Sequence, residues 1–250
     1  MLLAIDGGNS VVKFGLFDGP TLVNVWRFPN GQTVTHQDCN QIKEQLGAGL
    51  DGKNVEAIIV SGLIPSTLIW LEDEFLKLTA ILVNHKMKTG LKLLYHDPSE
   101  LGTDRIADSV AAVEKYGAPC IVVDFGTATT FNAINSDREF LGGMIVSGIK
   151  TAFNALSENT GLPRSINFEP PYKLIGSSTY GSLQSGWYYG TIDMVDGLIK
   201  RIRTEMGGSP RVIATGGLGA AMEIRCEYVD VYDETLTLDG LRMLYEMNKA

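Results

Sequence analysis

The chain is poor in the residues that build metal centres and nucleophilic triads, because its 250 residues include only three cysteines and three histidines. The cysteines lie far apart and form no CxxC pair, which argues against a zinc site and indicates reduced packing residues of an intracellular protein. They are Cys39, Cys120 and Cys226. None of the histidines lies in a nucleophile-like context, so a Ser-His-Asp mechanism is not indicated.

Basic residues are also scarce. Lys and Arg number 21 against 29 Asp and Glu, which gives a formal net charge of −8 and a pI near 4.9. Proteins that bind nucleic acid regardless of its sequence need a basic surface, so this class is excluded. No apolar run approaches the ~20 residues of a membrane span, and Met1 leads directly into an expected strand. We therefore expect a cytoplasmic protein with no signal peptide, no nucleic-acid partner and no membrane association.

The common nucleotide-binding motifs are missing or incomplete. No GxxxxGK[ST] loop occurs. The segment Gly216-Gly217-x-Gly219 falls short of the dinucleotide fingerprint, because Met222 occupies the position of the last small residue. The loop still follows an apolar strand and lets the backbone approach a flat or anionic group, which keeps a nucleotide-binding role open.

One stretch does carry a binding signature. An apolar strand beginning at Cys120 ends at Asp124, and Gly126 and Thr127 lead into a second β-rich strand. A carboxylate at a strand end lies where ligands gather in α/β folds. Glycine permits close backbone approach, and threonine supplies hydroxyl and N–H donors, so the stretch suits a phosphate or a metal-bound anion. Taken alone, however, it is more typical of an ordinary hairpin with a polar tip.

The start of the chain repeats this pattern. Aligning Asp6 with Asp124 brings Gly8 onto Gly126, and a β-rich strand follows in both copies. A repeat of this size indicates a duplicated domain. In the first copy, three successive strands followed by strands that alternate with helices indicate an α/β domain, and the second copy repeats the pattern.

The expected elements follow from apolar periodicity and turn residues. In the first expected domain, residues 1–115, we place strands at 2–5, 11–17, 22–28, 55–60 and 81–83 and helices at 37–46, at 66–78 and from the N-cap Thr103 to Gly117, which ends the helix. In the second, residues 116–250, we place strands at 120–123, 128–135, 139–146, 210–215 and 228–231 and helices at 149–158, 179–206 and 238–247.

The paired turns indicate two phosphate-binding hairpins. The small residues after Asp6 offer backbone N–H groups that can wrap a phosphate, and Lys13 can neutralise charge or be an ordinary exposed strand lysine. Asp6 and Asp124 can hold cations or metal-bound water opposite the phosphates, as phosphoryl transfer requires. Asp104 lies in the first turn of a helix that we expect Thr103 to cap, where an acid can have a chemical role or simply favour the helix dipole.

The two Asp-x-Gly hairpins and the C-terminal glycine loop resemble the acetate kinase, sugar kinase, heat-shock protein and actin superfamily. More narrowly, the chain resembles the type III pantothenate kinases over nearly its whole length. The matching segments occur in the family's order: Asp6-Gly7-Gly8-Asn9-Ser10, Gly102-Thr103-Asp104-Arg105, Asp124-Phe125-Gly126-Thr127-Ala128-Thr129-Thr130, Gly142–Gly148, Ser178-Thr179 and Ala214–Gly217. The Gly-x-Asp-Arg element upstream of Asp-x-Gly-Thr is the specific part, because the wider superfamily lacks it.

The resemblance implies an α/β fold of duplicated ribonuclease H-like (actin-like ATPase) domains with the active site in the interdomain cleft. The implied activity is ATP-dependent phosphorylation of pantothenate to 4'-phosphopantothenate, the first step of coenzyme A biosynthesis. The implied cofactors are Mg²⁺ with ATP and a monovalent cation, K⁺ or NH₄⁺. The implied assembly is a homodimer in which the neighbouring subunit contributes residues to the pocket.

The residue roles implied by the resemblance fall into three groups. Asp104 is the expected catalytic base, and the residues expected to line the pantothenate pocket are Tyr95, Gly102, Thr103, Asp104, Arg105 and Thr179, the last from the neighbouring subunit. The residues expected to contact ATP are Asp6, Gly7, Gly8, Asn9, Ser10, Val11, Val12, Lys13 and Thr127. Asp124 is the expected ligand of the monovalent cation.

General chemistry supports these residue types. An alcohol is a poor nucleophile, so a carboxylate that accepts its proton contributes typically ~10²–10⁴-fold. An arginine beside that base can bind a planar substrate carboxylate with two parallel hydrogen bonds. Positioning and charge neutralisation must supply most of the remaining acceleration.

Some positions depart from the family's commoner residues. Gly7 stands where valine is common, Ser10 replaces threonine, and Ser177 stands where lysine is frequent. Two other functions therefore stay open: a non-catalytic, transcription-accessory relative of the same family, and another small-molecule kinase of the superfamily. The intact Asp104 and Asp124 favour the enzyme, since a regulator has no evident need for both a base and a cation site.

Overall fold

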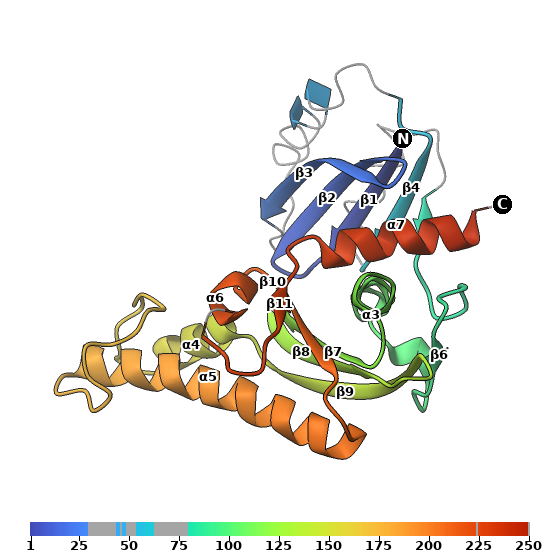
Figure 1. The fold of residues 1–250 in the computed structure, drawn as a ribbon. Helices are drawn as coiled ribbons and strands as arrows, with labels where there is room; N and C mark the ends of the chain where they lie inside the picture. The colour runs from blue at the N-terminus through green and yellow to red at the C-terminus, as the bar shows by residue number, and fades with distance from the viewer. Residues whose placement is uncertain (30–43, 46, 49–53, 63–79, 224, 250) are drawn as a thin grey trace. The chain divides into compact units, whose positions relative to one another are not determined.

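The computed structural model describes residues 1–29, 44–45, 47–48, 54–62, 80–223 and 225–249. The helix expected at 66–78, and most of the one expected at 37–46, lie outside the described residues. The chain divides into two compact units, Met1–Lys115 with Thr235–Ala250 and Tyr116–Glu234 (Figure 1).

The first unit contains a five-stranded sheet in the order β3-β2-β1-β4-β5. Its strands are β1 (Leu2–Gly7), β2 (Val11–Asp18), β3 (Thr21–Pro29), β4 (Ala57–Ser61) and β5 (Ile81–Leu82). The first three strands are antiparallel, and β4 and β5 then run parallel to β1. The five expected strands are confirmed within a few residues at each end. One face of β1 and β4 is lined by buried Leu3, Ile5, Ile58 and Val60, which form the centre of the core.

The described part of the first unit also contains the short strand β6 (Lys92–Leu93), the single turn η1 (Pro98–Glu100) and two longer helices. Helix α3 (Thr103–Tyr116) follows η1, and helix α7 (Leu236–Asn248) comes from the far end of the chain. Figure 1 shows α7 lying along the first sheet, where it contacts β1, β2 and β4.

The position of α7 differs from the expected division, which assigned all of residues 116–250 to the second domain. Leu238, Leu241 and Leu244 lie on one side of this helix and are completely or almost completely buried. An amphipathic helix must bury its apolar side against a neighbour. The first sheet and α3 supply that neighbour, so residues 235–250 pack with the first unit.

The second unit repeats the first sheet. Its strands β7 (Cys120–Phe125), β8 (Ala128–Ile134), β9 (Glu139–Ser147), β10 (Arg211–Gly216) and β11 (Val231–Tyr232) adjoin in the order β11-β10-β7-β8-β9. As in the first unit, the three successive strands are antiparallel and the next two run parallel to the first of them. The expected duplication is confirmed, and both copies are ribonuclease H-like.

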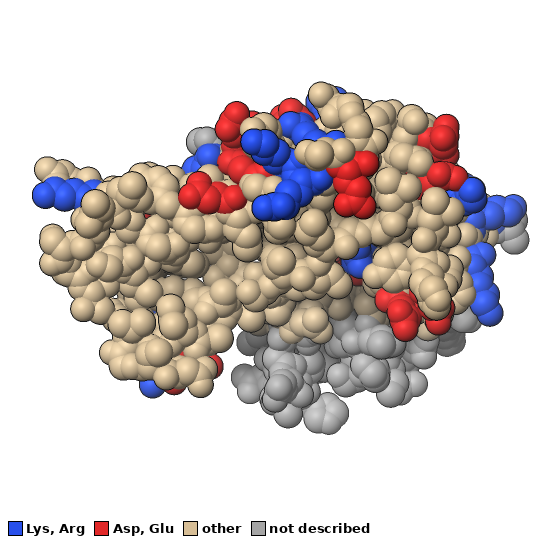
Figure 2. All heavy atoms as spheres, turned by 90° about the horizontal axis from the view of Figure 1, so that it is seen from below, with Lys and Arg blue, Asp and Glu red and all other residues tan. Residues whose placement is uncertain are grey.

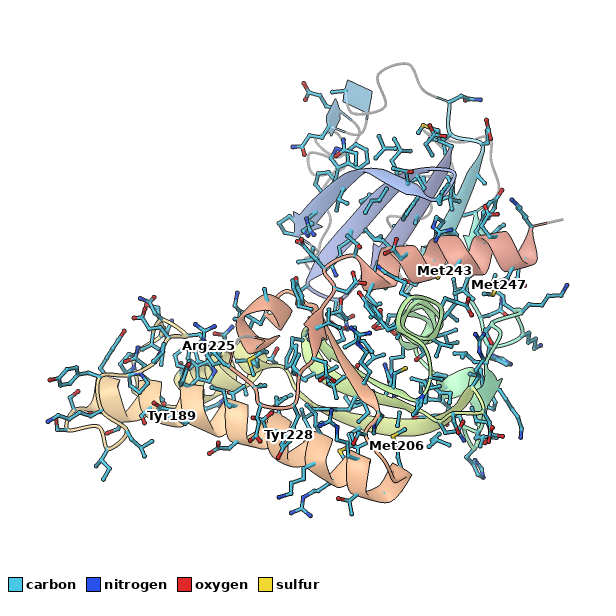
Figure 3. All side chains as sticks on the ribbon, in the orientation of Figure 1. Tyr189, Met206, Arg225, Tyr228, Met243 and Met247 are labelled. Carbon is cyan, nitrogen blue, oxygen red and sulfur yellow. The ribbon has the colours of Figure 1, made fainter. Side chains whose placement is uncertain are left out.

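Three helices belong to the second unit: α4 (Ile149–Glu158), α5 (Thr179–Met206) and α6 (Gly219–Glu223). Helix α5 buries Val195, Ile199 and Ile202 in the core that β7, β8 and β10 line. The segment after α6 also lies against α5 (Figure 3). There Arg225 Nε donates a hydrogen bond of 3.0 Å to the hydroxyl of Tyr188 on α5.

Charged side chains of both signs are mixed on the face shown in Figure 2, and large uncharged areas surround them. Across the described residues, the search for a helix with the length and apolarity of a membrane span found none.

Candidate active site

Asp6 lies near the end of β1, and the sheet register places it directly opposite Lys13 on β2 and Ser61 on β4. Side chains that face each other across neighbouring strands point to the same face of the sheet. Ser61 Oγ donates a hydrogen bond of 3.0 Å to Asp6 Oδ1, and Lys13 Nζ lies 3.9 Å from Asp6 Oδ2. The expected first phosphate loop therefore begins at a carboxylate with a hydroxyl and an ammonium group beside it.

Burial raises the pKa of the Asp6 carboxyl above its ordinary value. The Lys13 ammonium opposes this shift, the Asp104 carboxylate adds to it, and the Ser61 hydrogen bond opposes it again. Asp6 is only 8% exposed, so little water remains to stabilise its charge. A bound cation would therefore favour the ionised form of Asp6. The effect of Asp104 also means that the expected base lies within electrostatic reach of the expected phosphate loop.

The remaining residues of the expected phosphate loop run from the end of β1 through the turn into the start of β2. In chain order they are Gly7, Gly8, Asn9, Ser10, Val11 and Val12. Asn9 and Ser10 are exposed, whereas the Val12 side chain is buried in the core. Val12 can therefore offer a ligand only its backbone, and the small residues before it let the backbone come close to an anion.

The Gly102–Arg105 element forms the start of α3. The carbonyl oxygen of Gly102 accepts a hydrogen bond of 3.1 Å from Ile106 N, which makes Gly102 the N-cap. Thr103 was expected at that position but is the first helical residue, and its Oγ1 accepts a hydrogen bond of 2.8 Å from Gly62 N. The hydroxyl therefore joins α3 to the end of β4 instead of capping the helix.

Asp104 and Arg105 lie in the first turn of α3, as expected. Asp104 is half-buried, and its Oδ1 accepts a hydrogen bond of 2.8 Å from Arg105 N. The Arg105 side chain is buried, with its guanidinium carbon 5.9 Å from the centroid of the Tyr95 ring. This separation is within the range of a cation–π contact. The first unit thus brings Asp104, Arg105 and Tyr95 close together.

Asp124 occupies the corresponding place in the second unit. It lies near the end of β7, directly opposite Thr130 on β8 and Thr215 on β10. Two threonines thus stand where the first copy has a lysine and a serine. Asp124 is half-buried, while Thr215 is completely buried.

Thr127, expected to contact ATP, is exposed in the turn between β7 and β8. Its carbonyl oxygen accepts a hydrogen bond of 3.0 Å from Gly148 N and one of 2.7 Å from Thr151 Oγ1. Gly148 is the N-cap of α4, and Thr151 lies in the first turn of that helix. The start of α4 therefore holds the second turn in position.

Thr179 is the first residue of α5 and is exposed. The preceding Ser178 caps the helix, because its Oγ accepts a hydrogen bond of 3.1 Å from Gly181 N. Thr179 belongs to the second unit, whereas Asp104 and Arg105 belong to the first. Its place in a pantothenate pocket stays a prediction.

Ser61 and Thr215 are two site residues that the sequence analysis missed. Both follow an apolar strand and precede a glycine, so the strand-hydroxyl-glycine pattern is a second repeat in the chain. The following glycines, Gly62 and Gly216, both have a positive φ, +82° and +86°. This second repeat was a usable signal, because glycine is the residue that readily adopts such angles.

Each unit therefore offers an acidic strand end with hydroxyl or ammonium neighbours, next to a turn of small residues. The first unit adds a carboxylate and an arginine at a helix start. Phosphoryl transfer to an alcohol uses such parts, namely a proton acceptor, donors around the phosphates and oxygen ligands for metal ions. In the described residues there is no cluster of three or more His, Cys, Asp and Glu that could hold a metal ion. Mg²⁺, which typically binds one or two carboxylates and substrate phosphates, does not need such a cluster.

Comparisons with known proteins agree with a function in phosphoryl transfer to an alcohol. The type III pantothenate kinase family model matches residues 2–201. The type III pantothenate kinase of Anaeromyxobacter sp. (strain Fw109-5) is 42% identical over 100% of both chains. The enzyme of the same name from Halalkalibacterium halodurans is 38% identical over 99% of this chain and 100% of its own.

Solved structures share the fold at lower identity. A protein of Campylobacter jejuni described as a Baf family transcriptional activator is 22% identical, with a TM-score of 0.62 over 98% of both chains. A ROK family glucokinase from Streptomyces griseus, solved with glucose and AMPPNP, is 11% identical, with a TM-score of 0.50 over 98% of both chains. At these identities the likeness concerns the fold alone.

The match over most of the chain and the full-length relatives establish what the geometry suggested. The protein is a phosphotransferase with an alcohol group as acceptor, and its substrates are pantothenate and ATP. The chain belongs to the type III pantothenate kinases, the enzymes that phosphorylate pantothenate in the first step of coenzyme A biosynthesis.

Proposed function

We propose that Asp104 is the general base that accepts the proton of the pantothenate hydroxyl as the phosphoryl group is transferred. The observation that carries the proposal is the hydrogen bond of 2.8 Å from Gly62 N to Thr103 Oγ1, which holds the start of α3, with the half-buried Asp104, beside the end of β4, where Ser61 is hydrogen-bonded to Asp6. A base must lie close to both the acceptor hydroxyl and the transferred phosphoryl group.

Arg105 would bind the pantothenate carboxylate. Its guanidinium is buried beside Tyr95, which restricts the orientations of the side chain and prepares it for a planar anion. Thr103 would then act mainly through the backbone of Gly62, with which its hydroxyl is hydrogen-bonded. Together these residues would orient pantothenate with its hydroxyl at Asp104.

ATP would be bound by the Asp6–Lys13 loop in the first unit and by Thr127 in the second. Mg²⁺ would reach Asp6 with the nucleotide phosphates, and it supplies charge neutralisation on the transferred group when bound. The raised pKa of Asp6 fits this role, because a buried carboxylate gains most from a nearby cation. A monovalent cation would bind at Asp124 and stabilise negative charge on that side of the reaction.

The active form would be a cytoplasmic homodimer. Four large side chains are exposed at and just before the start of α5: Tyr172, Leu174, Ile175 and Tyr180, with Tyr172 96% and Ile175 85% exposed. Contiguous exposed apolar side chains are typical of interaction surfaces. Burying them against a second copy would carry Thr179 toward that copy's pantothenate pocket.

The base assignment is tested by replacing Asp104 with Asn. Turnover of pantothenate with ATP should fall by about 10²–10⁴-fold while the circular dichroism spectrum stays unchanged, because only the proton acceptor is lost. Glu100→Gln, an exposed acid-to-amide change just before α3, is the matched control and should keep the wild-type rate. An Asp104→Asn enzyme with near wild-type turnover would show that another group takes the proton.

The dimer is tested by Ile175→Asp in gel filtration with light scattering. A buried aspartate is costly at an apolar interface, so the variant should elute as a monomer and lose turnover together with the dimer. Leu82→Asp is the control, because Leu82 is a 53% exposed apolar residue on β5 in the first unit. If Ile175→Asp stays as dimeric as Leu82→Asp, the surface before α5 is not the interface.

A further inference from the structure

Each sheet carries an aspartate near the end of a central strand, with a polar residue opposite it on each neighbouring strand, but these neighbouring residues differ between the two sheets. In the first unit, each oxygen of the Asp6 carboxylate has a polar group of the chain beside it. Ser61 Oγ donates to Oδ1 at 3.0 Å, and Lys13 Nζ lies 3.9 Å from Oδ2. The positive charge beside this carboxylate is therefore part of the protein.

In the second unit, the strand register places Thr130 and Thr215 on either side of Asp124. Thr130 is 9% exposed and Thr215 is 0% exposed. Their Oγ1 atoms are buried, and neither has a hydrogen-bond partner within the described part of the chain. Buried hydroxyl groups are nearly always hydrogen-bonded in proteins, so two such groups on the residues that flank Asp124 point to a bound ligand.

The space around the Asp124 carboxylate is kept open by glycines. A Cβ atom on Gly216 would lie only 2.3 Å from Asp124 Oδ1, and one on Gly126 would lie 3.5 Å from Oδ2. A side chain at position 216 would therefore fill the place that the carboxylate takes. The site consists of one carboxylate and two hydroxyl oxygens, which are ligands for a hard cation. With a single carboxylate, it matches a cation of one positive charge.

We propose that Thr130 and Thr215 complete the monovalent-cation site of Asp124, and that this cation takes the role that the Lys13 ammonium has beside Asp6. The proposal rests on the function proposed above for Asp124 and adds two ligands to it. Thr130 stands at the register position of Lys13, and Thr215 at that of Ser61. The proposed cation would therefore lie in the second copy where the Lys13 ammonium lies in the first.

The internal comparison also suggests a substitution. In the first copy, a lysine opposite the aspartate places its ammonium 3.9 Å from the carboxylate. A lysine at position 130 would start from the equivalent strand position, directly opposite Asp124. Thr130→Lys should therefore supply the charge internally and remove the need for a bound cation.

Thermal unfolding during a KCl titration tests the proposal without nucleotide or pantothenate. Ionic strength is held constant with choline chloride, because a ligand that binds only the folded state raises the melting temperature with its concentration. Wild type should be stabilised by K⁺ over choline, and Asp124→Asn should abolish this response. Thr130→Val and Thr215→Val should each require about ten- to hundred-fold more K⁺ for the same response, the usual effect of losing a group at a metal site.

Three further variants separate a ligand role from a packing role. Thr215→Ser keeps the hydroxyl and should keep the wild-type K⁺ response. Thr129→Val is the matched control, because the Thr129 Oγ1 is also buried without a partner among the described residues. However, Thr129 stands opposite Phe125 on the other face of the sheet, so its loss should leave the K⁺ response unchanged. Thr130→Lys should show no K⁺ response and should turn over pantothenate in choline alone.

The possible outcomes distinguish the cation site at Asp124 from the two threonine ligands proposed for it. If Asp124→Asn abolishes the K⁺ response but both valine variants keep the wild-type titration midpoint, Asp124 binds the cation and the threonine ligands are refuted. If wild type itself shows no K⁺ response, both the cation site and its two proposed ligands are refuted. Should Thr130→Lys fail to fold, the valine and serine variants still decide, because valine has nearly the shape of threonine and serine is smaller by one methyl group.

Discussion

Replacing Gly216 should reveal most about the site around Asp124 in the second unit. It ends β10 with φ at +86°, and a Cβ atom there would lie 2.3 Å from Asp124 Oδ1 and 2.7 Å from the backbone N and C of Phe125. The carboxylate could rotate away from an added methyl group, whereas the Phe125 backbone is fixed within the sheet. Gly216→Ala should therefore both strain the sheet edge and displace Asp124.

The size of the effect follows from these two terms. A non-glycine residue at positive φ costs roughly 1–2 kcal/mol, and inserting an atom into a filled space costs typically about 1–3 kcal/mol. The free energy of unfolding should thus fall by about 2–5 kcal/mol. For a chain of this size that corresponds to roughly 4–20 °C in the melting temperature, since about 2–4 °C accompany each kcal/mol. Because Gly216→Ala displaces Asp124, the stabilisation of the protein by K⁺ should also weaken.

Gly217→Ala is the control for this prediction. Among the described residues, no heavy atom beyond its chain neighbours lies within 4 Å of a Cβ atom built on Gly217, and its φ is outside the positive range. Its free energy of unfolding should stay within about 0.5 kcal/mol of wild type, as for most surface substitutions. Thermal unfolding followed by circular dichroism compares the pair directly. Equal melting temperatures for Gly216→Ala and Gly217→Ala would refute the close approach of Gly216 to the end of β7.

Three other predictions follow from the described residues. Because the pKa of Asp6 is raised, the stability that its neutral form contributes is complete below pH 3.8 and is lost as the pH rises through the raised pKa. In urea unfolding, the free energy of unfolding of Asp6→Asn should therefore increase relative to that of wild type over this pH range. Parallel pH profiles of the two proteins would contradict the raised pKa. Gly240→Ala should destabilise the protein by about 1–3 kcal/mol in thermal unfolding, because its Cβ would lie 2.0 Å from the carbonyl oxygen of Ala107 on α3. Gly197→Ala in α5 is the control: among the described residues no atom outside its own helix lies within 4 Å of the added Cβ, so the change should be neutral or stabilising by up to about 1 kcal/mol. Equal melting temperatures for the two variants would mean that α3 and α7 can separate at little cost. Burial raises the pKa of the Cys120 thiol to about 12, so iodoacetamide should not alkylate it at neutral pH until the protein is denatured. Mass spectrometry measures the labelling, and fast labelling of the folded protein would contradict the burial of Cys120.

The sequence predicts local structure best where one signal dominates. The bounds of α5 agree with the expected 179–206, because Ser178 caps its start and Gly207, with φ at +74°, ends it. The duplication was visible for a similar reason. Asp6 and Asp124 stand at the same point of a short strand-turn-strand pattern, and such a hairpin is encoded by residues close together in the chain.

Pairings between distant segments are what the sequence did not reveal. Ser61 and Thr215 reach the two aspartates only through parallel strands, and the segments that separate each pair differ in length. Parallel strands need a long connection, so local patterning does not fix which residue faces which. Thr103 illustrates the same limit, because its residue type favours an N-cap while a partner at Gly62 takes its hydroxyl. The site roles taken from the family resemblance remain predictions that the experiments above address.

The return of α7 to the first unit has a consequence for biosynthesis. Helix α7, which covers β1, β2 and β4, is synthesised only after all of residues 116–234. Domains tend to fold as units while the chain is made, so the second unit can finish before the first, although it comes later in the sequence. A nascent chain that stops short of residue 235 would leave the Phe17 ring without the Arg242 guanidinium that lies over it, and the sheet face around Gly15 without the side chain of Leu238. Loss of α7 by premature termination or proteolysis would therefore destabilise the unit that carries Asp6 and Asp104.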